Sequence, residues 1–182
     1  MPGWLNIPNS LTLLRLALTP FVIRSVLMAQ DGLALAVFSA AALTDGLDGA
    51  LARRLNAITR TGAYLDPIAD KTLLSGTCVA LALAGKVPTW FVVLVFGRDL
   101  LILAGAVVLM AFTSRRRFPP TFWGKLSTML QSLYTLLLLV SAAVPWQVFH
   151  WSAAALLWPA AAATAWSGVH YAITGARRPA KR

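Results

Sequence analysis

Apolar runs long enough to cross a lipid bilayer recur along this chain, and they restrict its fold more than any other feature. A helix needs about 20 mostly apolar residues to span the hydrocarbon core of a membrane. Hydrophobic residues make up 58% of the 182 residues and charged residues only 12%, whereas a soluble domain of this length needs a far more polar surface. The sequence therefore predicts an all-α integral membrane protein.

Short segments that contain Gly, Pro or several polar residues separate the apolar runs, as is typical of turns. No change of composition marks a second domain, so we expect a single domain over residues 1–182. The first run contains Arg15, Pro20 and Arg24 without a basic segment before it, so we expect mature structure rather than a cleaved signal peptide. Six transmembrane helices are predicted, at approximately 8–29, 32–55, 61–84, 88–112, 121–143 and 148–173.

The basic residues predict how these helices are oriented. The loops and chain ends on one side of the predicted helices carry eleven of them. The loops on the opposite side carry only Lys86. Cytoplasmic loops are enriched in Lys and Arg, so we expect both termini in the cytoplasm, with the cell membrane of a bacterium as the location. We interpret the net charge of +10 as contact with anionic membrane lipids, and we expect no nucleic-acid partner. The eleven residues are Arg53, Arg54, Arg60, Arg115, Arg116, Arg117, Lys125, Arg177, Arg178, Lys181 and Arg182.

Four of the six acidic residues fall within 26 positions, between long apolar runs. Carboxylates at membrane depth are costly, so a cluster of them indicates a metal, ion or proton site. Asp45 and Asp48 are three residues apart on the second predicted helix, and Asp66 and Asp70 are four apart on the third, so each pair shares a helix face. Both pairs lie toward the cytoplasmic ends of antiparallel neighbours. We therefore expect an intramembrane cavity that opens to the cytoplasm.

Four carboxylates in one small volume stay ionised only when cations compensate them, and oxygen-rich sites suit Mg²⁺ or Mn²⁺. Two such ions would balance the four Asp residues and could clamp a pyrophosphate. Small residues at 46, 49, 50 and 52 would allow a flat ligand to approach the second helix, although such residues also serve helix packing. Arg53 could bind a phosphate, or it could anchor the topology as Arg54 does.

The acidic residues belong to a longer pattern with fixed spacing: Asp45-x2-Asp48-Gly49-x2-Ala52-Arg53-x8-Gly62-x3-Asp66-x3-Asp70. This pattern resembles the complete signature of the CDP-alcohol phosphatidyltransferases. The six predicted helices and the predicted cytoplasmic site are also similar to that family, so the resemblance covers nearly the whole chain.

The resemblance implies a role for each matching position. Asp45, Asp48 and Asp66 would be metal ligands, and Asp70 would be a ligand that also acts as the general base. An acceptor hydroxyl would attack the lipid-proximal phosphorus of CDP-diacylglycerol and expel CMP. The family also implies a homodimer. The CDP moiety would contact Gly49, Ala52, Arg53 and Gly62, with Thr59 as a further contact.

The N-terminal segment Asn6–Arg15 resembles the branch of the family that contains phosphatidylglycerophosphate and cardiolipin synthases. Asn9, Thr12 and Arg15 are candidates to touch nucleotide or lipid phosphates, although a polar helix start at the membrane interface explains Asn9 and Thr12 equally well. Arg98 and Asp99 form either a structural neutral pair or part of the cavity wall, and we favour the cavity for Arg98.

Lys125 lies near the start of the fifth predicted helix and could bind an anionic acceptor. Alternatively, its side chain could simply extend to the membrane–water interface. Together, Arg15, Arg98 and Lys125 favour an anionic acceptor over choline or ethanolamine. Glycerol 3-phosphate, giving phosphatidylglycerophosphate, is our preferred acceptor. Phosphatidylglycerol, giving cardiolipin, is the alternative, and inositol phosphate is a weaker third choice.

Two other classes of membrane protein use intramembrane carboxylates. Membrane prenyltransferases typically use two Asp-rich motifs on separate helices. No acidic residue follows Asp99 in this chain, so a second motif of this kind is absent. A cation transporter would explain the carboxylates, but not the small-residue face or Arg53 beside them. The sole cysteine, Cys78, excludes an intrachain disulfide, and we interpret it as a packing residue.

Overall fold

The computed structural model describes residues 7–55, 60–112 and 121–176, and within these every regular element is a helix. Side chains at 7–9, 45–55, 60–64, 106, 108–112 and 175–176 lie outside the described part. The six predicted helices are confirmed, and their ends differ from the predicted ones by at most three residues. They are α1 (Ile7–Leu27), α2 (Asp31–Leu55), α3 (Arg60–Leu83), α4 (Thr89–Phe112), α5 (Phe122–Ala143) and α6 (Gln147–Ala176).

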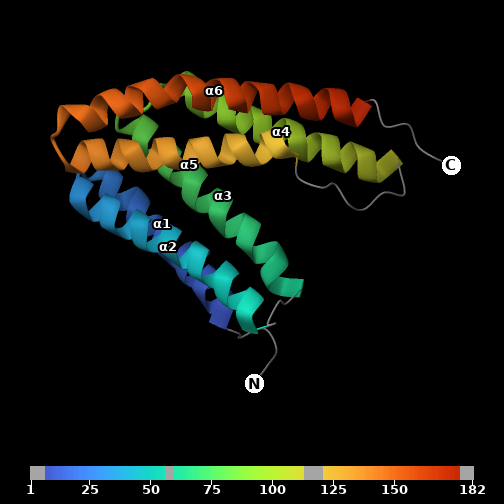
Figure 1. Ribbon diagram of the computed structural model, residues 1–182, viewed down its shortest axis with the longest axis horizontal. Coiled ribbons are helices and arrows are strands. Elements are labelled where there is room, and N and C mark those ends of the chain that lie inside the picture. Colours follow the sequence, from blue (N-terminus) through green and yellow to red (C-terminus); the bar gives the residue numbers. More distant parts are fainter. Residues whose placement is uncertain (1–6, 56–59, 113–120, 177–182) are drawn as a thin grey trace.

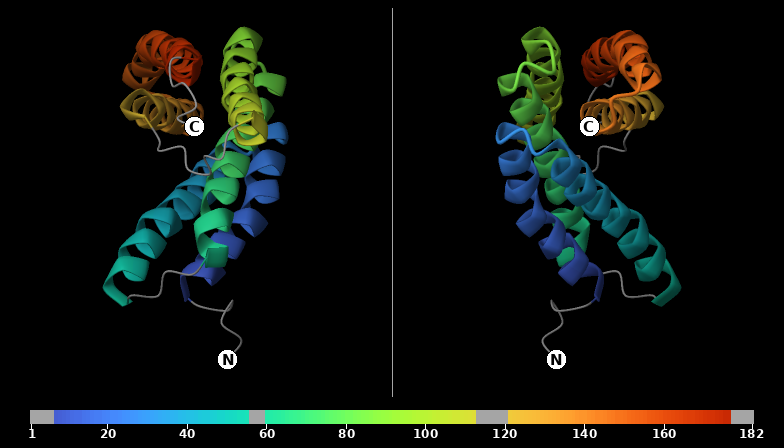
Figure 2. Two further views of the ribbon diagram at one scale, coloured as in Figure 1. Left: turned by 90° about the vertical axis from the view of Figure 1, so that its right-hand side faces the viewer. Right: turned by 90° about the vertical axis from the view of Figure 1, so that its left-hand side faces the viewer.

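The helices form two arms that meet at one end and diverge toward the other (Figure 1). In the first arm α1 packs on both α2 and α3, and in the second α6 packs on both α4 and α5. The turns that follow α1, α3 and α5 lie together where the arms meet, which we call the joined end. Helices α1, α3 and α5 therefore begin, and α2, α4 and α6 end, at the opposite, open end. The side views in Figure 2 look nearly along α5 and α6 and show α2 splaying away from α1 and α3 within the first arm.

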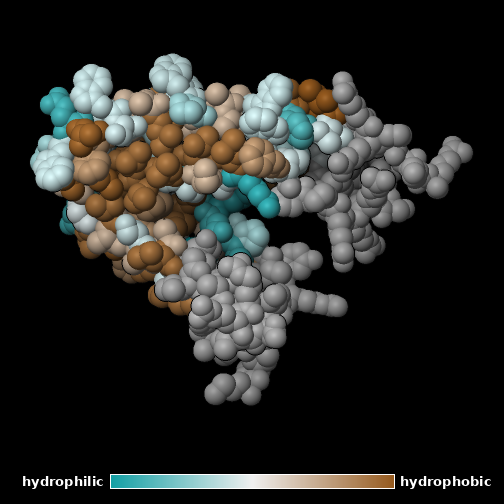
Figure 3. All heavy atoms as spheres, viewed as in Figure 1, coloured by the Kyte–Doolittle hydropathy of each residue, from teal (hydrophilic) through white to brown (hydrophobic). Residues whose placement is uncertain are grey.

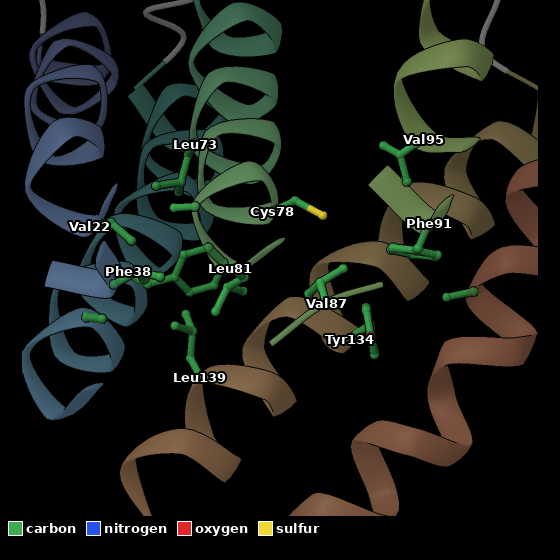
Figure 4. Close-up of a cluster of buried hydrophobic side chains, with 14 of the residues drawn as sticks. Val22, Phe38, Leu73, Cys78, Leu81, Val87, Phe91, Val95, Tyr134 and Leu139 are labelled. Carbon is green, nitrogen blue, oxygen red and sulfur yellow. The ribbon is translucent and has the colours of Figure 1, made fainter. Parts of the chain in front are cut away.

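A core of buried apolar side chains near the joined end holds the arms together (Figure 4). Val22 of α1, Phe38 of α2 and Leu81 of α3 are at most 4% exposed, and all belong to this core. Within the second arm, the rings of Phe91 on α4 and Tyr134 on α5 pack edge to face with their centroids 5.0 Å apart. Cys78 is buried in the same core, as predicted.

Local chemistry explains two of the turns at the joined end and the start of α5. Ala29 and Gly85 adopt positive φ angles of 54° and 72°, which reverse the chain after α1 and α3. Lys86 forms an ion pair with Asp31 at the start of α2, which ties the two turns together. At the open end, Thr121 caps α5 by accepting a 3.1 Å hydrogen bond from the Gly124 N–H.

Two helices within the described residues are long and apolar enough to cross a membrane, over Ser10–Leu27 and Phe122–Ala143. Large apolar side chains also point outward from α4 and α6, including Leu100 at 67% exposure and Trp158 at 68%. Figure 3 shows apolar residues over much of the described surface on one face, with hydrophilic residues gathered where the arms diverge. These features agree with a helical membrane protein, while six separate membrane crossings stay a prediction.

Candidate active site

The packing of α1 against α3 brings two polar side chains onto the predicted carboxylates. Thr12 donates a hydrogen bond from Oγ1 to Oδ1 of Asp66, at 2.5 Å, and Arg15 donates from Nη1 to Oδ1 of Asp70. Asp66 and Asp70 are one helical turn apart on α3, and Thr12 and Arg15 are nearly one turn apart on α1. Matched helical spacings therefore align two polar pairs near the open end.

Arg15 and Asp70 differ sharply in exposure. The Arg15 side chain is 0% exposed, whereas the Asp70 side chain is 48% exposed. A buried guanidinium requires a negative partner, because the unpaired charge would be costly in an apolar surrounding. Asp70 supplies that charge and still presents an accessible face. The carboxylate predicted to act as the base is thus anchored by Arg15 and remains about half exposed.

A second polar cluster surrounds Arg98 in the other arm. Its guanidinium donates from Nη2 to the hydroxyl groups of Ser127, at 3.1 Å, and Ser167, at 2.9 Å, and from Nη1 to Oδ1 of Asp99, at 2.8 Å. Gly124 allows this close approach, since an added Cβ would lie 3.3 Å from Nη2 of Arg98. Arg98 is only 8% exposed and joins α4, α5 and α6.

These contacts bear on the predicted acceptor role of Arg98. Nε, Nη1 and Nη2 all donate to protein atoms, which favours a packing role for this side chain. Asp99 is its ion-pair partner, as the neutral-pair interpretation predicted. Contact between Arg98 and an acceptor stays a prediction.

An ion pair between Lys71 and Asp99 connects the site on α1 and α3 with the Arg98 cluster. Lys71, the residue after Asp70, places its Nζ 2.9 Å from Oδ2 of Asp99 on α4. Asp99 therefore contacts a cation from each arm, Lys71 from the first and Arg98 from the second. The partner of Lys71 lies on a different helix, so no local sequence pattern indicates it.

Lys125 lies in the first turn of α5, and its side chain is exposed. Its side chain makes no hydrogen bond or ion pair with the part of the chain that the structure describes, while its backbone N–H donates to the Thr121 carbonyl at 3.1 Å. The predicted cation at the start of the fifth helix is therefore available to a ligand. Its role toward an acceptor stays a prediction.

The other predicted site residues lie outside the described side chains. Asp45, Asp48, Gly49, Ala52 and Arg53 fall within α2, Gly62 within α3 and Asn9 within α1, while Thr59 lies outside the described residues altogether. Among the described side chains no group of three or more His, Cys, Asp or Glu could hold a metal ion. The oxygen donors of Asp66 and Asp70 suit a hard divalent cation, and the four-carboxylate site stays a prediction.

Sequence reasoning missed the roles of Ser127 and Ser167. Their signal was present as small and polar residues at helical spacing, over Gly124, Ser127 and Gln131 on α5 and over Thr164 and Ser167 on α6. Gln131 also donates to Thr164, at 2.8 Å, so the two helices share a polar seam. Such seams are common where membrane helices pack closely.

The family model of the CDP-alcohol phosphatidyltransferases matches residues 5–166. A probable phosphatidylglycerophosphate synthase of Mycobacterium tuberculosis is 35% identical over 179 residues, covering 94% of this chain and 82% of the relative. The cardiolipin synthase (CMP-forming) of Streptomyces coelicolor is 33% identical, covering 93% and 82%. The human cardiolipin synthase (CMP-forming) is 31% identical, covering 91% of this chain and 61% of the relative.

Proposed function

Because this chain belongs to the CDP-alcohol phosphatidyltransferase family, we propose that it transfers the phosphatidyl group of CDP-diacylglycerol to glycerol 3-phosphate. The products would be phosphatidylglycerophosphate and CMP. The observation that carries the proposal is the pair Asp66 and Asp70, which end the family signature. They lie one turn apart near the open end and are contacted from α1 by Thr12 and Arg15.

In the proposed reaction the acceptor hydroxyl oxygen forms a bond to the lipid-proximal phosphorus, and the bond from that phosphorus to CMP breaks. Asp70 receives the hydroxyl proton, for which its half-exposed carboxylate is suitably accessible. The buried Arg15 fixes the orientation of Asp70. Thr12 fixes Asp66 in the same way, so the carboxylates are positioned before substrate arrives.

We assign Asp45, Asp48, Asp66 and Asp70 to hold two divalent cations, Mg²⁺ or Mn²⁺. When bound, such ions neutralise pyrophosphate and stabilise the charge of the departing CMP. The oxygen-only donor set of Asp66 and Asp70 supports this assignment. We assign Gly49, Ala52, Arg53 and Gly62 to the CDP moiety, together with Thr59 and Asn9.

The preference for an anionic acceptor rests mainly on Lys125, because Arg15 and Arg98 are engaged with protein partners. Lys125 is exposed in the first turn of α5, near Gly124 and the Arg98 cluster. A phosphate-bearing alcohol would find a compensating charge there, whereas choline or ethanolamine would not.

The proposal is tested with purified protein, labelled CDP-diacylglycerol and Mg²⁺ or Mn²⁺, with each acceptor supplied separately. We expect CMP release that depends on glycerol 3-phosphate, stops with a chelator and returns with the metal. Absence of CMP release with every acceptor would refute the transferase proposal.

Cardiolipin synthesis is the second candidate, because relatives at 33% and 31% identity carry that name. In that case the acceptor would be phosphatidylglycerol, and the same four carboxylates would serve. CMP release with phosphatidylglycerol, but not with glycerol 3-phosphate or inositol phosphate, would establish this alternative.

A variant of Lys125 tests the acceptor side separately. We predict that Lys125→Gln raises the KM for glycerol 3-phosphate by about tenfold, since a contact to a charged group contributes about that factor. The KM for CDP-diacylglycerol is the internal control and should not change. Equal KM values for glycerol 3-phosphate in variant and wild type would remove Lys125 from the acceptor site.

We also propose that the protein is a homodimer in a bacterial cell membrane, with the open end facing the cytoplasm. Val93, Leu100 and Val107 of α4 lie seven residues apart and are each more than half exposed, which forms an apolar stripe. A second copy or lipid would cover this stripe. Light scattering of the detergent-solubilised protein distinguishes a dimer from a monomer.

A further inference from the structure

Lys71 forms an ion pair beside the candidate base and between the two arms. Its Nζ is 2.9 Å from Oδ2 of Asp99, which joins α3 to α4. Among the described residues this is the only ion pair between these two helices. Lys71 directly follows Asp70 in the sequence. In the proposed reaction the acceptor hydroxyl must approach Asp70, so the Lys71 amino group belongs to the residue next to the proposed base.

The two cations on Asp99 differ in how firmly the protein holds them. Arg98 is 8% exposed and donates to Ser127 and Ser167 as well as to Asp99. The Lys71 side chain is 59% exposed, and Asp99 is its only partner within the described residues. Exposed ion pairs contribute little to stability, so Lys71 can change partners at small cost. Asp99 would remain compensated by Arg98.

We propose that Lys71 is an acceptor-specificity residue: it leaves Asp99 and binds the phosphate of the incoming anionic acceptor. This inference rests on the proposed transfer to a phosphate-bearing alcohol. In glycerol 3-phosphate the reacting hydroxyl and the phosphate are separated by only three carbons. A phosphate on Lys71 therefore keeps the hydroxyl within the neighbourhood of Asp70.

The charges of the groups involved favour this exchange over a permanent ion pair between Lys71 and Asp99. Asp99 carries one negative charge that it shares between two cations. A phosphate monoester carries more negative charge and more acceptor oxygens, so it is the stronger partner for an ammonium group. The free enzyme then keeps Lys71 near the site without leaving its charge uncompensated.

The first test compares Lys71→Gln and Lys71→Arg with the wild type in steady-state kinetics. We expect Lys71→Gln to raise the KM for glycerol 3-phosphate about tenfold or more with little change in kcat, because it removes binding energy rather than the base. Lys71→Arg should restore most of the affinity. The KM for CDP-diacylglycerol and the unfolding temperature should stay at wild-type values.

The matched control is Lys86→Gln. Lys86 also pairs with an aspartate, Asp31, but at the joined end. This variant makes the same charge change and should leave both KM values unchanged. An unchanged KM for glycerol 3-phosphate in Lys71→Gln would overturn the proposal. An equal rise in the KM for CDP-diacylglycerol would also overturn it, and would assign Lys71 to the nucleotide.

Asp99→Asn separates an exchangeable partner from a fixed latch. The variant releases Lys71 from its ion pair, so we expect the KM for glycerol 3-phosphate to stay the same or fall. If the Lys71–Asp99 pair were a fixed latch, Asp99→Asn and Lys71→Gln would show the same loss. That result would refute the exchange.

These outcomes are separable from failure of the proposed function. If the wild type releases no CMP with any acceptor, the transferase proposal fails first. If it releases CMP and Lys71→Gln behaves as wild type toward glycerol 3-phosphate, only the role of Lys71 fails. Calorimetric binding of glycerol 3-phosphate to Asp70→Asn protein, with and without Lys71→Gln, gives a readout that does not need turnover.

Discussion

At the scale of single residues, the candidate site depends on carboxylates that are oriented by a neighbouring helix. Asp66 and Asp70 would repel each other and any further acidic residue nearby. Thr12 and Arg15 reduce that repulsion from the buried side, where solvent cannot. Asp70 is anchored by the buried Arg15 and remains 48% exposed. Under the proposed mechanism, Arg15 orients the carboxylate and the exposed face meets the acceptor hydroxyl.

Asp70→Asn should abolish turnover while retaining much of the nucleotide binding. Asn has nearly the same shape and can still accept the hydrogen bond from Arg15, but it cannot take up a proton. Loss of a general base typically reduces the rate by about 10²–10⁴-fold. The measurements are CMP release and binding of a CDP ligand. Asp31→Asn, at the joined end, is the control that should keep its activity; wild-type turnover in Asp70→Asn would remove Asp70 as the base.

Thr12→Val should weaken metal-dependent activity, because it removes the hydroxyl that orients Asp66 while keeping the side-chain volume. Partners that orient a metal ligand are typically worth about 10–100-fold in metal affinity or activity. Titration of CMP release with Mg²⁺ or Mn²⁺ should show a higher half-saturating concentration. Thr12→Ser keeps the hydroxyl and should behave nearly as wild type. Equal titration curves for Thr12→Val and wild type would contradict the role of Thr12.

Sequence spacing was sufficient to select Asp66 and Asp70 as a pair on one helix face, because helical periodicity is local. It was not sufficient to find that Thr12 and Arg15 contact them. Those contacts are formed by residues more than fifty positions apart in the sequence, and they depend on how α1 rotates and slides against α3. Such packing is decided by the combined shape of two helix surfaces, which no local pattern records.

At the scale of helices, the second arm is held by polar contacts as well as by apolar packing. Arg98 connects α4 to α5 and α6 through Ser127 and Ser167. Further along the same interface, Gln131 donates to Thr164. Helix existence and length were predictable, since each apolar run has the length of a membrane span. The use of Arg98 as a bridge was not, because it needs small residues on two other helices.

Arg98→Met should lower the free energy of unfolding by about 3 kcal/mol, at the lower end of the cost of breaking a buried ion pair. The lower end applies because Lys71 still compensates Asp99. Thermal unfolding in detergent measures the effect. The control is Arg24→Met, which removes an exposed arginine in the last turn of α1, at the joined end. It should change the free energy of unfolding by no more than about 0.5 kcal/mol. Equal stabilities for the two variants would show that the Arg98 bridge contributes nothing.

At the scale of the whole molecule, the arms are joined by an apolar core at one end and diverge at the other (Figures 1 and 4). The candidate site residues lie toward the diverging end, where a water-soluble alcohol and a lipid substrate could both approach. The sequence predicted which helix ends share a side, because successive helices alternate in direction. It did not predict the two arms, since that division depends on which helix pairs bury the most surface.

The alternating helices also fix a testable topology. If all six cross the membrane and the open end is cytoplasmic, Gln30 in the turn after α1 faces outward and Lys181 faces the cytoplasm. Cys78 is the sole cysteine and only 4% exposed, so the parent protein should react little with a maleimide. We predict that a membrane-impermeant maleimide labels Gln30→Cys in intact cells, but labels Lys181→Cys only after the cells are permeabilised. The reverse pattern would invert the orientation, and labelling of both from outside would refute the odd number of crossings, five, that the six-span topology places between them.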